Sequence, residues 1–184
     1  MTAIQIESED DLRTIAFKVC TVLEQFGVTA VLTGGSAATI YAPDVYQSRD
    51  ADFIAYVVKR AADFRAAIAT LGFTEQGGTY VHPAVPTTLD FPGEDIRIGS
   101  ELVERYATMK EAGSVLHILT PTDCVRDRLA SFFWYRDRSA LAAARGVAQA
   151  RPSDVDLAEI GDSAARHGET GKFQEFIQSL DDVH

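Results

Sequence analysis

The sequence predicts an α/β (α+β) protein in which a mixed β-sheet is packed by helices and is followed by a C-terminal helical bundle. Three observations support this prediction. Short β-rich runs alternate with helical segments in the first half of the chain, and a Gly-Gly-Ser turn beginning at Gly34 follows the first of these runs. After Thr120 the apolar residues recur at helical spacing. We therefore expect a sheet domain over residues 1–119 and a helical region over residues 120–184.

The elements of the sheet domain follow from local signals. Ser8 and Asp11 resemble a capping box, and the apolar residues after them recur at helical spacing until Gly27 ends the helix. Two consecutive glycines, Gly77 and Gly78, indicate the turn of a β-hairpin. The predicted elements after the first helix are, in chain order, strand 29–33, helix 37–41, strand 53–58, helix 59–71, hairpin strands 73–75 and 80–82, and strand 87–91.

The second half of the chain is predicted to be mostly helical. Residues 100–109 have helical spacing, and residues 115–119 are a strand candidate for the edge of the sheet. Thr120 followed by Pro121 is a strong helix start, because proline suits the first helical position. The predicted C-terminal helices span residues 121–135, 139–149, 155–167 and 171–180.

Two acids near the start of the second strand are the strongest candidates for chemistry. Asp50 and Asp52 are two residues apart, so on a strand their side chains point to the same face. Paired carboxylates suit Mg²⁺, which prefers oxygen ligands and keeps part of its shell for water and substrate phosphates. Acids also begin strands on solvated loops, so the pair alone is a weak signal.

A third acid would complete a site for two metal ions. Asp90 is the candidate, since Leu89 and Phe91 flank it and leave it alone on the opposite face of a predicted strand. A solvated strand face would explain Asp90 equally well.

The Gly-Gly-Ser turn is a candidate phosphate site. Gly34 and Gly35 let the backbone turn tightly and approach a ligand, and the N–H groups at the start of the following helix favour anions. Ser36 is either a phosphate-contacting hydroxyl or a helix cap. Arg49, next to the acid pair, can contact a phosphate or neutralise the acids.

Together these motifs resemble the nucleotidyltransferase fold of the DNA polymerase β superfamily. The shared order is a strand, Gly-Gly-Ser, a helix, Asp-x-Asp on a second strand, and an apolar-flanked acid on a later strand. Thirteen residues separate Ser36 from Asp50, slightly more than the commonest spacing in that superfamily.

A second resemblance lies at residues 119–141. This segment is similar to the helix after the catalytic sheet in nucleotidyltransferase-like proteins of the abortive-infection and toxin-antitoxin type. Those families carry an acid, then Lys or Arg, then Leu, and later an Arg-Asp pair. Asp127, Arg128 and Leu129 fit this pattern, with Arg in place of the commoner Lys, and an Arg-Asp pair follows at Arg136.

The resemblance implies a metal-dependent nucleotidyltransferase that moves an NMP from a nucleoside triphosphate such as ATP to an acceptor hydroxyl. The residues it assigns to catalysis and to two Mg²⁺ ions, or to Mn²⁺ in their place, are Asp50, Asp52 and Asp90. The residues it assigns to nucleotide binding are Gly34, Gly35, Ser36, Arg49 and Arg128. Arg126 or Arg136 would add a further cation near the phosphates. RNA, tRNA or a protein is the implied acceptor, in a phage-defence or toxin-antitoxin setting with a cognate antitoxin as partner.

Other functions stay open at this stage. Relatives of this kind include drug-modifying transferases that act on aminoglycoside hydroxyls. A nucleotide-binding regulator or an antitoxin-like partner would use the fold without catalysis, although a decayed site would be expected to lose at least one carboxylate. A plain α/β interaction domain with chance motifs would be favoured if Asp90 lay far from Asp50 and Asp52.

The charge balance bears on the partner. A net charge of −10 disfavours a broadly basic face for nucleic acid. The segment from Arg126 to Arg151 nevertheless holds six arginines, and Asp127 and Asp137 are the acids between them. Two interpretations are equally supported: a helix that binds triphosphate or a short RNA, and a solvated helix face with ion pairs.

Composition indicates a compact protein of 184 residues. Apolar runs are too short to cross a membrane and the first residues are acidic where a signal peptide would be basic, so we expect a cytoplasmic protein with no membrane partner. Cys20 and Cys124 fall in predicted helices without a CxxC motif, which predicts buried free thiols.

Overall fold

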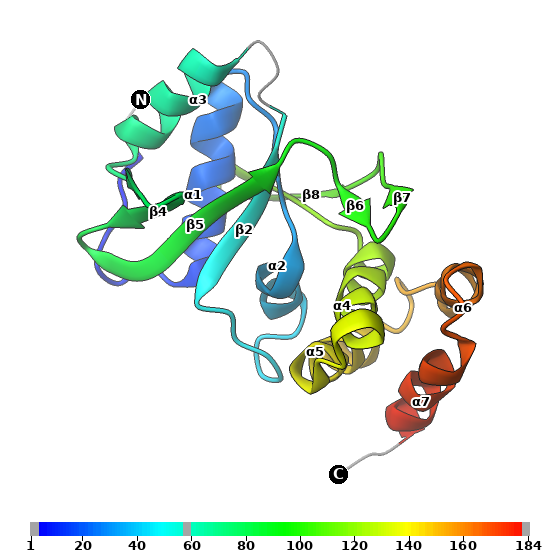
Figure 1. Cartoon of the computed structure of the whole chain (residues 1–184). Coiled ribbons are helices and arrows are strands. Elements are labelled where there is room, and N and C mark those ends of the chain that lie inside the picture. Colours follow the sequence, from blue (N-terminus) through cyan, green and yellow to red (C-terminus); the bar gives the residue numbers. More distant parts are fainter. Residues whose placement is uncertain (1–3, 57–59, 182–184) are drawn as a thin grey trace.

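The computed structural model describes residues 4–56 and 60–181, in which helices pack around a seven-stranded mixed sheet (Figure 1). The described helices are α1 Leu12–Gln25, α2 Gly34–Tyr41, α3 Ala61–Thr70, α4 Pro121–Tyr135, α5 Arg138–Ala150, α6 Leu157–Arg166 and α7 Thr170–Asp181. The described strands are β1 Ala30–Leu32, β2 Asp50–Ala55, β3 Thr74–Gln76, β4 Thr79–His82, β5 Val85–Gly93, β6 Arg97–Ile98, β7 Glu101–Leu102, β8 Ala107–Glu111 and β9 Ser114–Ile118. The predicted fold class is confirmed. Residues 57–59, which the predicted strand 53–58 and helix 59–71 include in part, lie outside the described residues.

The three central strands of the sheet are β5, β2 and β1. Its strand order is β3-β4-β5-β2-β1-β9-β8, and the short strands β6 and β7 pair separately. Strand β2 runs parallel to β5 and antiparallel to β1, while β1 runs parallel to β9. Because β2 has a hydrogen-bonded neighbour on each side, the positions of its side chains are held firmly.

Helices α1 and α3 lie against one face of the sheet (Figure 1). Phe53 of β2 and Phe91 of β5 stack on that face with ring centroids 5.6 Å apart, and Phe64 of α3 meets Phe91 edge-on at 4.8 Å. Successive residues of a strand point to opposite faces, so the neighbouring acids Asp52 and Asp90 point away from these helices. The fold therefore separates an apolar face from a face that carries acids.

The predictions made from local signals at helix starts and turns are partly confirmed. Asp11, rather than Ser8, caps α1, because its carboxylate accepts a hydrogen bond from the backbone N–H of Thr14 at 2.8 Å. The predicted capping box is corrected accordingly. Gly77 and Gly78 have φ values of 63° and 93° and connect β3 to β4, so the predicted hairpin is confirmed.

The helix predicted over residues 100–109 is wrong. This segment contains β7 and the first part of β8, and β8 pairs with β9. Ala112 and Gly113 make the turn between these two strands with φ values of 47° and 84°. Both turn residues are left-handed, as a tight hairpin of this kind requires, but alanine is an unusual choice there. The hairpin signal is therefore weak in the sequence, and strand pairing overrides the helical spacing.

The strand predicted for the edge of the sheet lies inside it instead. β9 has β1 on one side, with Ile118 opposite Leu32, and β8 on the other. Strand β8 is the edge of the sheet. The helical spacing of residues 100–109 predicts a helix where β8 begins. The sequence therefore predicts no strand that could pair with the outer side of β9.

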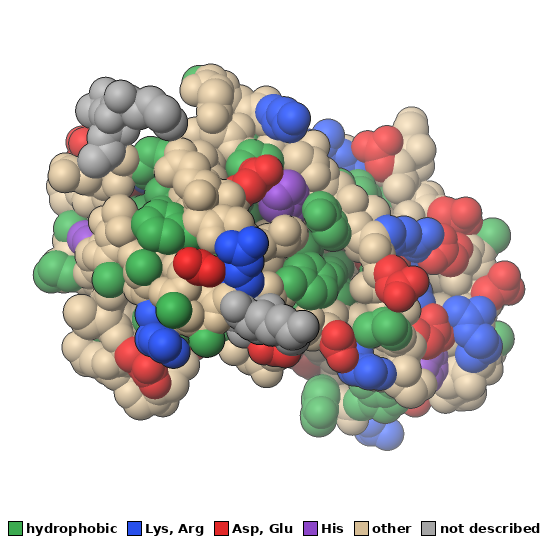
Figure 2. Space-filling view, turned by 90° about the horizontal axis from the view of Figure 1, so that it is seen from above, with side chains coloured by type: hydrophobic (Ala, Val, Ile, Leu, Met, Phe, Trp, Pro, Cys, Tyr) green, Lys and Arg blue, Asp and Glu red, His purple; other side chains and the backbone are tan. Residues whose placement is uncertain are grey.

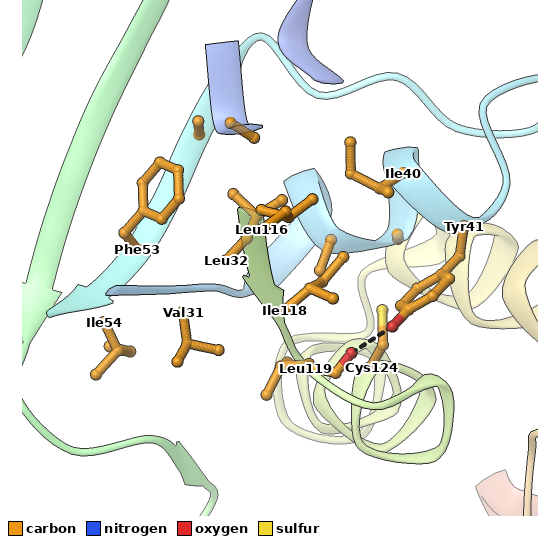
Figure 3. Close-up of a cluster of buried hydrophobic side chains, with 14 of the residues drawn as sticks. Val31, Leu32, Ile40, Tyr41, Phe53, Ile54, Leu116, Ile118, Leu119 and Cys124 are labelled. Atoms are coloured by element: carbon orange, nitrogen blue, oxygen red, sulfur yellow. Dashed lines mark hydrogen bonds between the residues drawn. The ribbon is translucent and has the colours of Figure 1, made fainter. Parts of the chain in front are cut away.

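Helix α2 joins the sheet to the C-terminal helices and is buried along its whole length. It contacts β2, α4 and α5, and its Ile40 and Tyr41 lie in the apolar cluster with Ile118 and Leu119 (Figure 3). The hydroxyl of Tyr41 donates a hydrogen bond to the carbonyl oxygen of Leu119 at 2.7 Å. The sheet and the helical bundle therefore share α2 as a common structural element.

A cluster of charged side chains attaches the β6–β7 hairpin to the C-terminal helices. Arg126 of α4 is nearly buried, with 7% of its side chain exposed, and it pairs with Asp123 at 2.6 Å and with Glu101 of β7. Glu101 also pairs with Arg166 of α6 at 3.0 Å, and Arg105 pairs with Asp123 at 2.7 Å. We refer to these five residues as the charged cluster.

The charged cluster is expected to make stability fall in acid. A hydrogen bond from Arg166, supported by the charge of Arg126, lowers the pKa of Glu101. Burial opposes ionisation of Asp123, but hydrogen bonds that include those from Arg105 and Arg126 outweigh it and lower the pKa of Asp123. Such carboxylates stabilise the fold above their unfolded pKa values, and this stabilisation is lost as the pH falls through their lower folded values.

Urea unfolding between neutral pH and about pH 3 measures this loss. The midpoint should fall as the pH drops below the ordinary carboxyl pKa values, 4.5 for Glu and 3.8 for Asp. Glu101→Gln should flatten the pH dependence, whereas the exposed Glu75→Gln should keep the wild-type profile. Identical profiles for wild type and Glu101→Gln would contradict a role for the cluster in acid unfolding.

The two cysteines are buried free thiols, as predicted. Burial raises the pKa of the Cys20 thiol to about 12, and burial also raises the pKa of Cys124. Neither thiol is therefore ionised near neutral pH, so both side chains act as apolar packing groups.

The molecular surface in Figure 2 carries acidic and basic side chains in close alternation, without a continuous basic area on that face. Three arginines of the arginine-rich segment have acidic partners: Arg126 in the charged cluster, Arg128 with Asp127, and Arg138 with Glu175. These pairs favour the ion-pair interpretation of the segment. Across residues 4–56 and 60–181, no helix has both the length and the apolar character needed to cross a membrane.

Candidate metal-dependent active site

Asp50 and Asp52 project from β2 onto the acid-bearing face of the sheet. Ala51 and Phe53, which alternate with them, are fully buried on the other face. The hydroxyl of Ser48 donates a hydrogen bond to one carboxylate oxygen of Asp50 at 2.8 Å and so helps to orient it. The two acids share one face, as their spacing predicts.

Asp90 lies directly opposite Asp52, because β2 and β5 are parallel neighbours in that register. The hydroxyl of Thr79 donates a hydrogen bond to a carboxylate oxygen of Asp90 at 2.6 Å. The flanking residue Leu89 is buried, and Phe91 stacks on Phe53. Asp90 therefore faces the acid pair, and a plain interaction domain with a distant Asp90 loses its support.

The three acids form a site that can hold a metal ion. Asp50, Asp52 and Asp90 each offer a carboxylate oxygen, and these oxygens lie within 4.8 Å of one another. Burial, followed by the charges of Asp50 and Asp90, raises the pKa of Asp52 to about 6. A divalent cation would offset this repulsion, and an all-oxygen donor set is what Mg²⁺ and Mn²⁺ prefer. The residues present therefore fit such an ion.

Gly34 brings the backbone against this acid site. Its φ of +64° lies in the left-handed region that favours glycine. A Cβ at Gly34 would lie 2.7 Å from a carboxylate oxygen of Asp52, so a larger residue would displace the acid. Gly34 is also the first residue of α2, where Thr33 makes no side-chain capping bond within the described part of the chain. The N–H groups at this helix start are thus available to an anion.

Tyr46 lies over Gly35 and is a site residue that the sequence did not indicate. A Cβ at Gly35 would lie 2.9 Å from the hydroxyl oxygen of Tyr46, so the phenol closes one side of the helix start. Tyr46 belongs to the connection between α2 and β2, where no motif marks it. Tyr46 is the aromatic side chain of this connection, and that was the one available signal.

The hydroxyl of Ser36 does not face the site. It is fully buried, donates to the carbonyl oxygen of Thr33 at 2.7 Å, and accepts from the backbone N–H of Asp52 at 3.1 Å. Thr33 rather than Ser36 occupies the cap position of α2. Both sequence interpretations of Ser36 are therefore corrected: its hydroxyl ties α2 to β2 and so positions Gly34 relative to Asp52.

A cleft of about 250 Å³ adjoins the acid site on the side of α4. Its lining includes Gly34, Asp52, Asp127 and Arg128. The Arg128 guanidinium lies 2.6 Å from a carboxylate oxygen of Asp127, and its charge lowers the pKa of Asp52 in opposition to the stronger effects of burial and the other acids. Arg128 thus provides a cation next to the acids, where the resemblance placed one.

The other predicted cations lie elsewhere. Arg49 is exposed and forms no ion pair with the described acids. Arg126 is buried in the charged cluster, because residues two apart on a helix point to different faces and Arg128 takes the face toward the cleft. Arg136 follows the end of α4 with a φ of 54° and is exposed. The role predicted for Arg126 near the phosphates is therefore wrong.

Comparison with solved structures identifies a similar fold. The crystal structure of an antigenic nucleotidyltransferase-like protein from Paracoccidioides brasiliensis matches with a TM-score of 0.59. The chain has a nucleotidyltransferase-like fold. The match covers 92% of this chain and 94% of that chain at 14% sequence identity, so it supports the nucleotidyltransferase-like fold and leaves activity to be argued from the site. No family model and no curated protein matches the sequence.

Divalent cations are expected to raise the melting temperature if the acid site of this nucleotidyltransferase-like fold binds them. An ion that binds only the folded state at about a hundred times its Kd stabilises by about 2.7 kcal/mol, which corresponds to a rise of about 5–10 °C for a domain of this size. Thermal unfolding with Mg²⁺ or Mn²⁺, against NaCl of equal ionic strength, measures this. Asp52→Asn should lose the rise and Glu75→Gln should keep it; equal rises in both would place the ion elsewhere.

Proposed function

We propose that the protein is a metal-dependent nucleotidyltransferase that moves an NMP from a nucleoside triphosphate to an acceptor hydroxyl. One observation carries this proposal: carboxylates from two parallel strands converge beside a glycine at a helix start and an arginine. Asp52, Gly34 and Arg128 line the same cleft. A cation site, an anion site and a fixed positive charge in one place suit the transfer of a phosphoryl group.

The phosphates would be held from two sides. Backbone N–H groups at Gly34 and Gly35 begin α2 and can donate to phosphate oxygens. The Arg128 guanidinium can donate from the opposite wall in a planar fork, and its ion pair with Asp127 holds it in place. The hydroxyl of Tyr46 lies beside Gly35 and can contribute a further donor.

Asp50, Asp52 and Asp90 would hold Mg²⁺ or Mn²⁺. When bound there, the metal would neutralise phosphate charge and lower the pKa of the acceptor hydroxyl. The acceptor oxygen forms a bond to the α-phosphorus while the bond from that phosphorus to the bridging oxygen breaks, and pyrophosphate leaves with the electron pair. Asp90, whose carboxylate accepts a hydrogen bond from Thr79, would receive the hydroxyl proton.

The acceptor class comes from the family resemblance, because the residues of the acid site do not identify it. We infer RNA, tRNA or a protein as the acceptor, within a phage-defence or toxin-antitoxin role and with a cognate antitoxin as a partner, and a small molecule of the aminoglycoside type is the alternative that the resemblance also offers. Acidic and basic side chains alternate on the face in Figure 2, which supports neither class over the other.

Transfer of label from each α-³²P nucleoside triphosphate into the RNA and the protein of a cell lysate tests the proposal. The assay contains Mg²⁺ and compares wild type with Asp50→Asn, Asp90→Asn and the control Glu75→Gln. Label that needs both aspartates and survives the control would establish nucleotidyl transfer, and the labelled fraction would identify the acceptor class. Label that persists in either aspartate variant would overturn the assigned site. No label with wild type would argue against both acceptor classes.

A further inference from the structure

A second groove continues from the cleft along the acid-bearing face of the sheet. It measures about 370 Å³, and Asp95 and Ile96 line both the groove and the cleft. Its other lining residues include Tyr56, Leu102, Glu104 and Tyr106. The cleft and this groove therefore form one trough with a shared wall.

The floor of the trough follows β2 and the residue after it. Asp52, Ile54 and Tyr56 alternate with buried residues, so they lie in one row, with Asp52 and Ile54 in the cleft and Tyr56 in the groove. Four residues of a strand span about 13 Å. A ligand that begins at Asp52 and reaches Tyr56 must therefore be elongated.

The chemistry of the groove differs from that of the cleft. Tyr56 and Tyr106 each expose 37% of their surface, and Leu102 exposes 50%. Asp95 and Glu104 add two carboxylates, and no lysine or arginine is found among the described residues that line the groove. Arg97 of the adjoining cleft lies 3.6 Å from Asp95, whereas Glu104 forms no ion pair with the described basic residues. Burial first, and then Tyr106, Asp95 and Glu104, raise the pKa of Tyr56, in agreement with their close approach. Two aromatic rings with carboxylates suit a flat group that donates hydrogen bonds, and they disfavour phosphate.

The direction of transfer limits what can occupy this groove, if the proposed function holds. Attacking and leaving oxygens lie roughly in line on opposite sides of the transferred phosphorus. With the leaving phosphates between Gly34 and Arg128, the acceptor must approach from the side of the acids away from the cleft. The groove shares Asp95 and Ile96 with the cleft that would hold these phosphates, so it suits the nucleoside of the triphosphate better than the acceptor.

We propose that the groove between Tyr56 and Tyr106 binds the base of the nucleoside triphosphate and selects guanine. A purine offers more surface for stacking than a pyrimidine does. Carboxylates accept hydrogen bonds and cannot donate them, and guanine presents two adjacent N–H donor groups on one edge. Adenine and cytosine each present one amino group there beside an acceptor, and uracil presents one N–H between two carbonyls. Asp95 or Glu104 would therefore pair best with guanine.

Calorimetric titration with the α,β-methylene analogues of GTP, ATP, CTP and UTP in Mg²⁺ tests this proposal, because these analogues bind without transfer. Wild type should bind the GTP analogue about tenfold more tightly than the UTP analogue, as expected for one good bidentate pair. At least one of the variants Glu104→Gln and Asp95→Asn should reduce the preference for the GTP analogue at least threefold. Tyr56→Leu should weaken the binding of all four analogues about fivefold or more, because the base loses a stacking partner. The control Glu75→Gln should match wild type.

Failures of the two proposals have different signatures. Four analogues that bind equally, with affinities unchanged by Glu104→Gln, Asp95→Asn and Tyr56→Leu, would overturn the base site and leave the proposed function standing. A preference for another base would also overturn the assignment of guanine. No binding of any analogue to wild type, with Mg²⁺ or with Mn²⁺, would overturn the proposed function and the base site with it.

Discussion

Asp52→Asn is expected to slow nucleotidyl transfer about a thousandfold and, at the same time, to raise the melting temperature of the metal-free protein. The carboxylate oxygens of Asp50, Asp52 and Asp90 lie within 4.8 Å of one another, so without a cation they repel. An amide at position 52 removes that repulsion and also removes a metal ligand. Charge stabilisation by a metal is worth several kcal/mol in the transition state, so the rate should fall about a thousandfold.

The rate and the melting temperature must be measured on the same preparations, in EDTA for stability and in Mg²⁺ for transfer. Asp50→Asn should likewise slow transfer and raise the melting temperature in EDTA. Glu75→Gln, an exposed acid on β3, controls for the change in net charge and should alter neither quantity. A variant that loses activity and is less stable than wild type in EDTA would indicate a structural role for Asp52.

Arg126→Met is expected to destabilise the protein by about 3 kcal/mol or more, the usual effect of removing one partner from a buried ion pair. Arg126 is 7% exposed, and its partner Asp123 is fully buried. Methionine keeps most of the aliphatic volume of arginine, so the loss reports the charge rather than a cavity. Urea unfolding measures the free energy, and a lower midpoint with an unchanged slope is the expected form.

Arg138→Met is the matched control for this measurement. Arg138 also pairs with an acid, Glu175, but 70% of its side chain is exposed. Exposed ion pairs contribute about 0–1 kcal/mol, so this variant should stay near wild type. Equal losses of unfolding free energy in the two variants would mean that burial does not determine how much the Arg126 ion pairs stabilise the protein.

The acid site could be predicted from the sequence because its determinants are local. One residue, Ala51, separates Asp50 from Asp52, and alternation on a strand is sufficient to place both side chains on one face. Asp90 was predictable for the same reason, since its apolar neighbours occupy the opposite face. What no local pattern specifies is the register that sets Asp90 opposite Asp52, which depends on the parallel pairing of distant strands.

The misassigned residues depend on long-range contacts. Ser36 is a residue type that commonly caps helices or contacts phosphate, yet its hydroxyl accepts a hydrogen bond from the backbone N–H of Asp52. Arg126 and Arg128 look alike in sequence, and only the packing of α4 against α6 and the β6–β7 hairpin separates a buried ion pair from a cleft residue. Within residues 100–109, β7 pairs with β6 and the start of β8 pairs with β9, and helical spacing cannot reveal these partners.

The burial of α2 affects how relatives of this chain can diversify. The first turn of this helix borders the acid site, and its last residue, Tyr41, bonds to the end of the sheet at Leu119. Helices α4 and α5 cover its remaining sides, whereas α6 and α7 do not contact α2 substantially. We expect α4 and α5 to be inherited together with the sheet as one unit, and α7, which lies outside the charged cluster, to be the part that relatives can lengthen or replace.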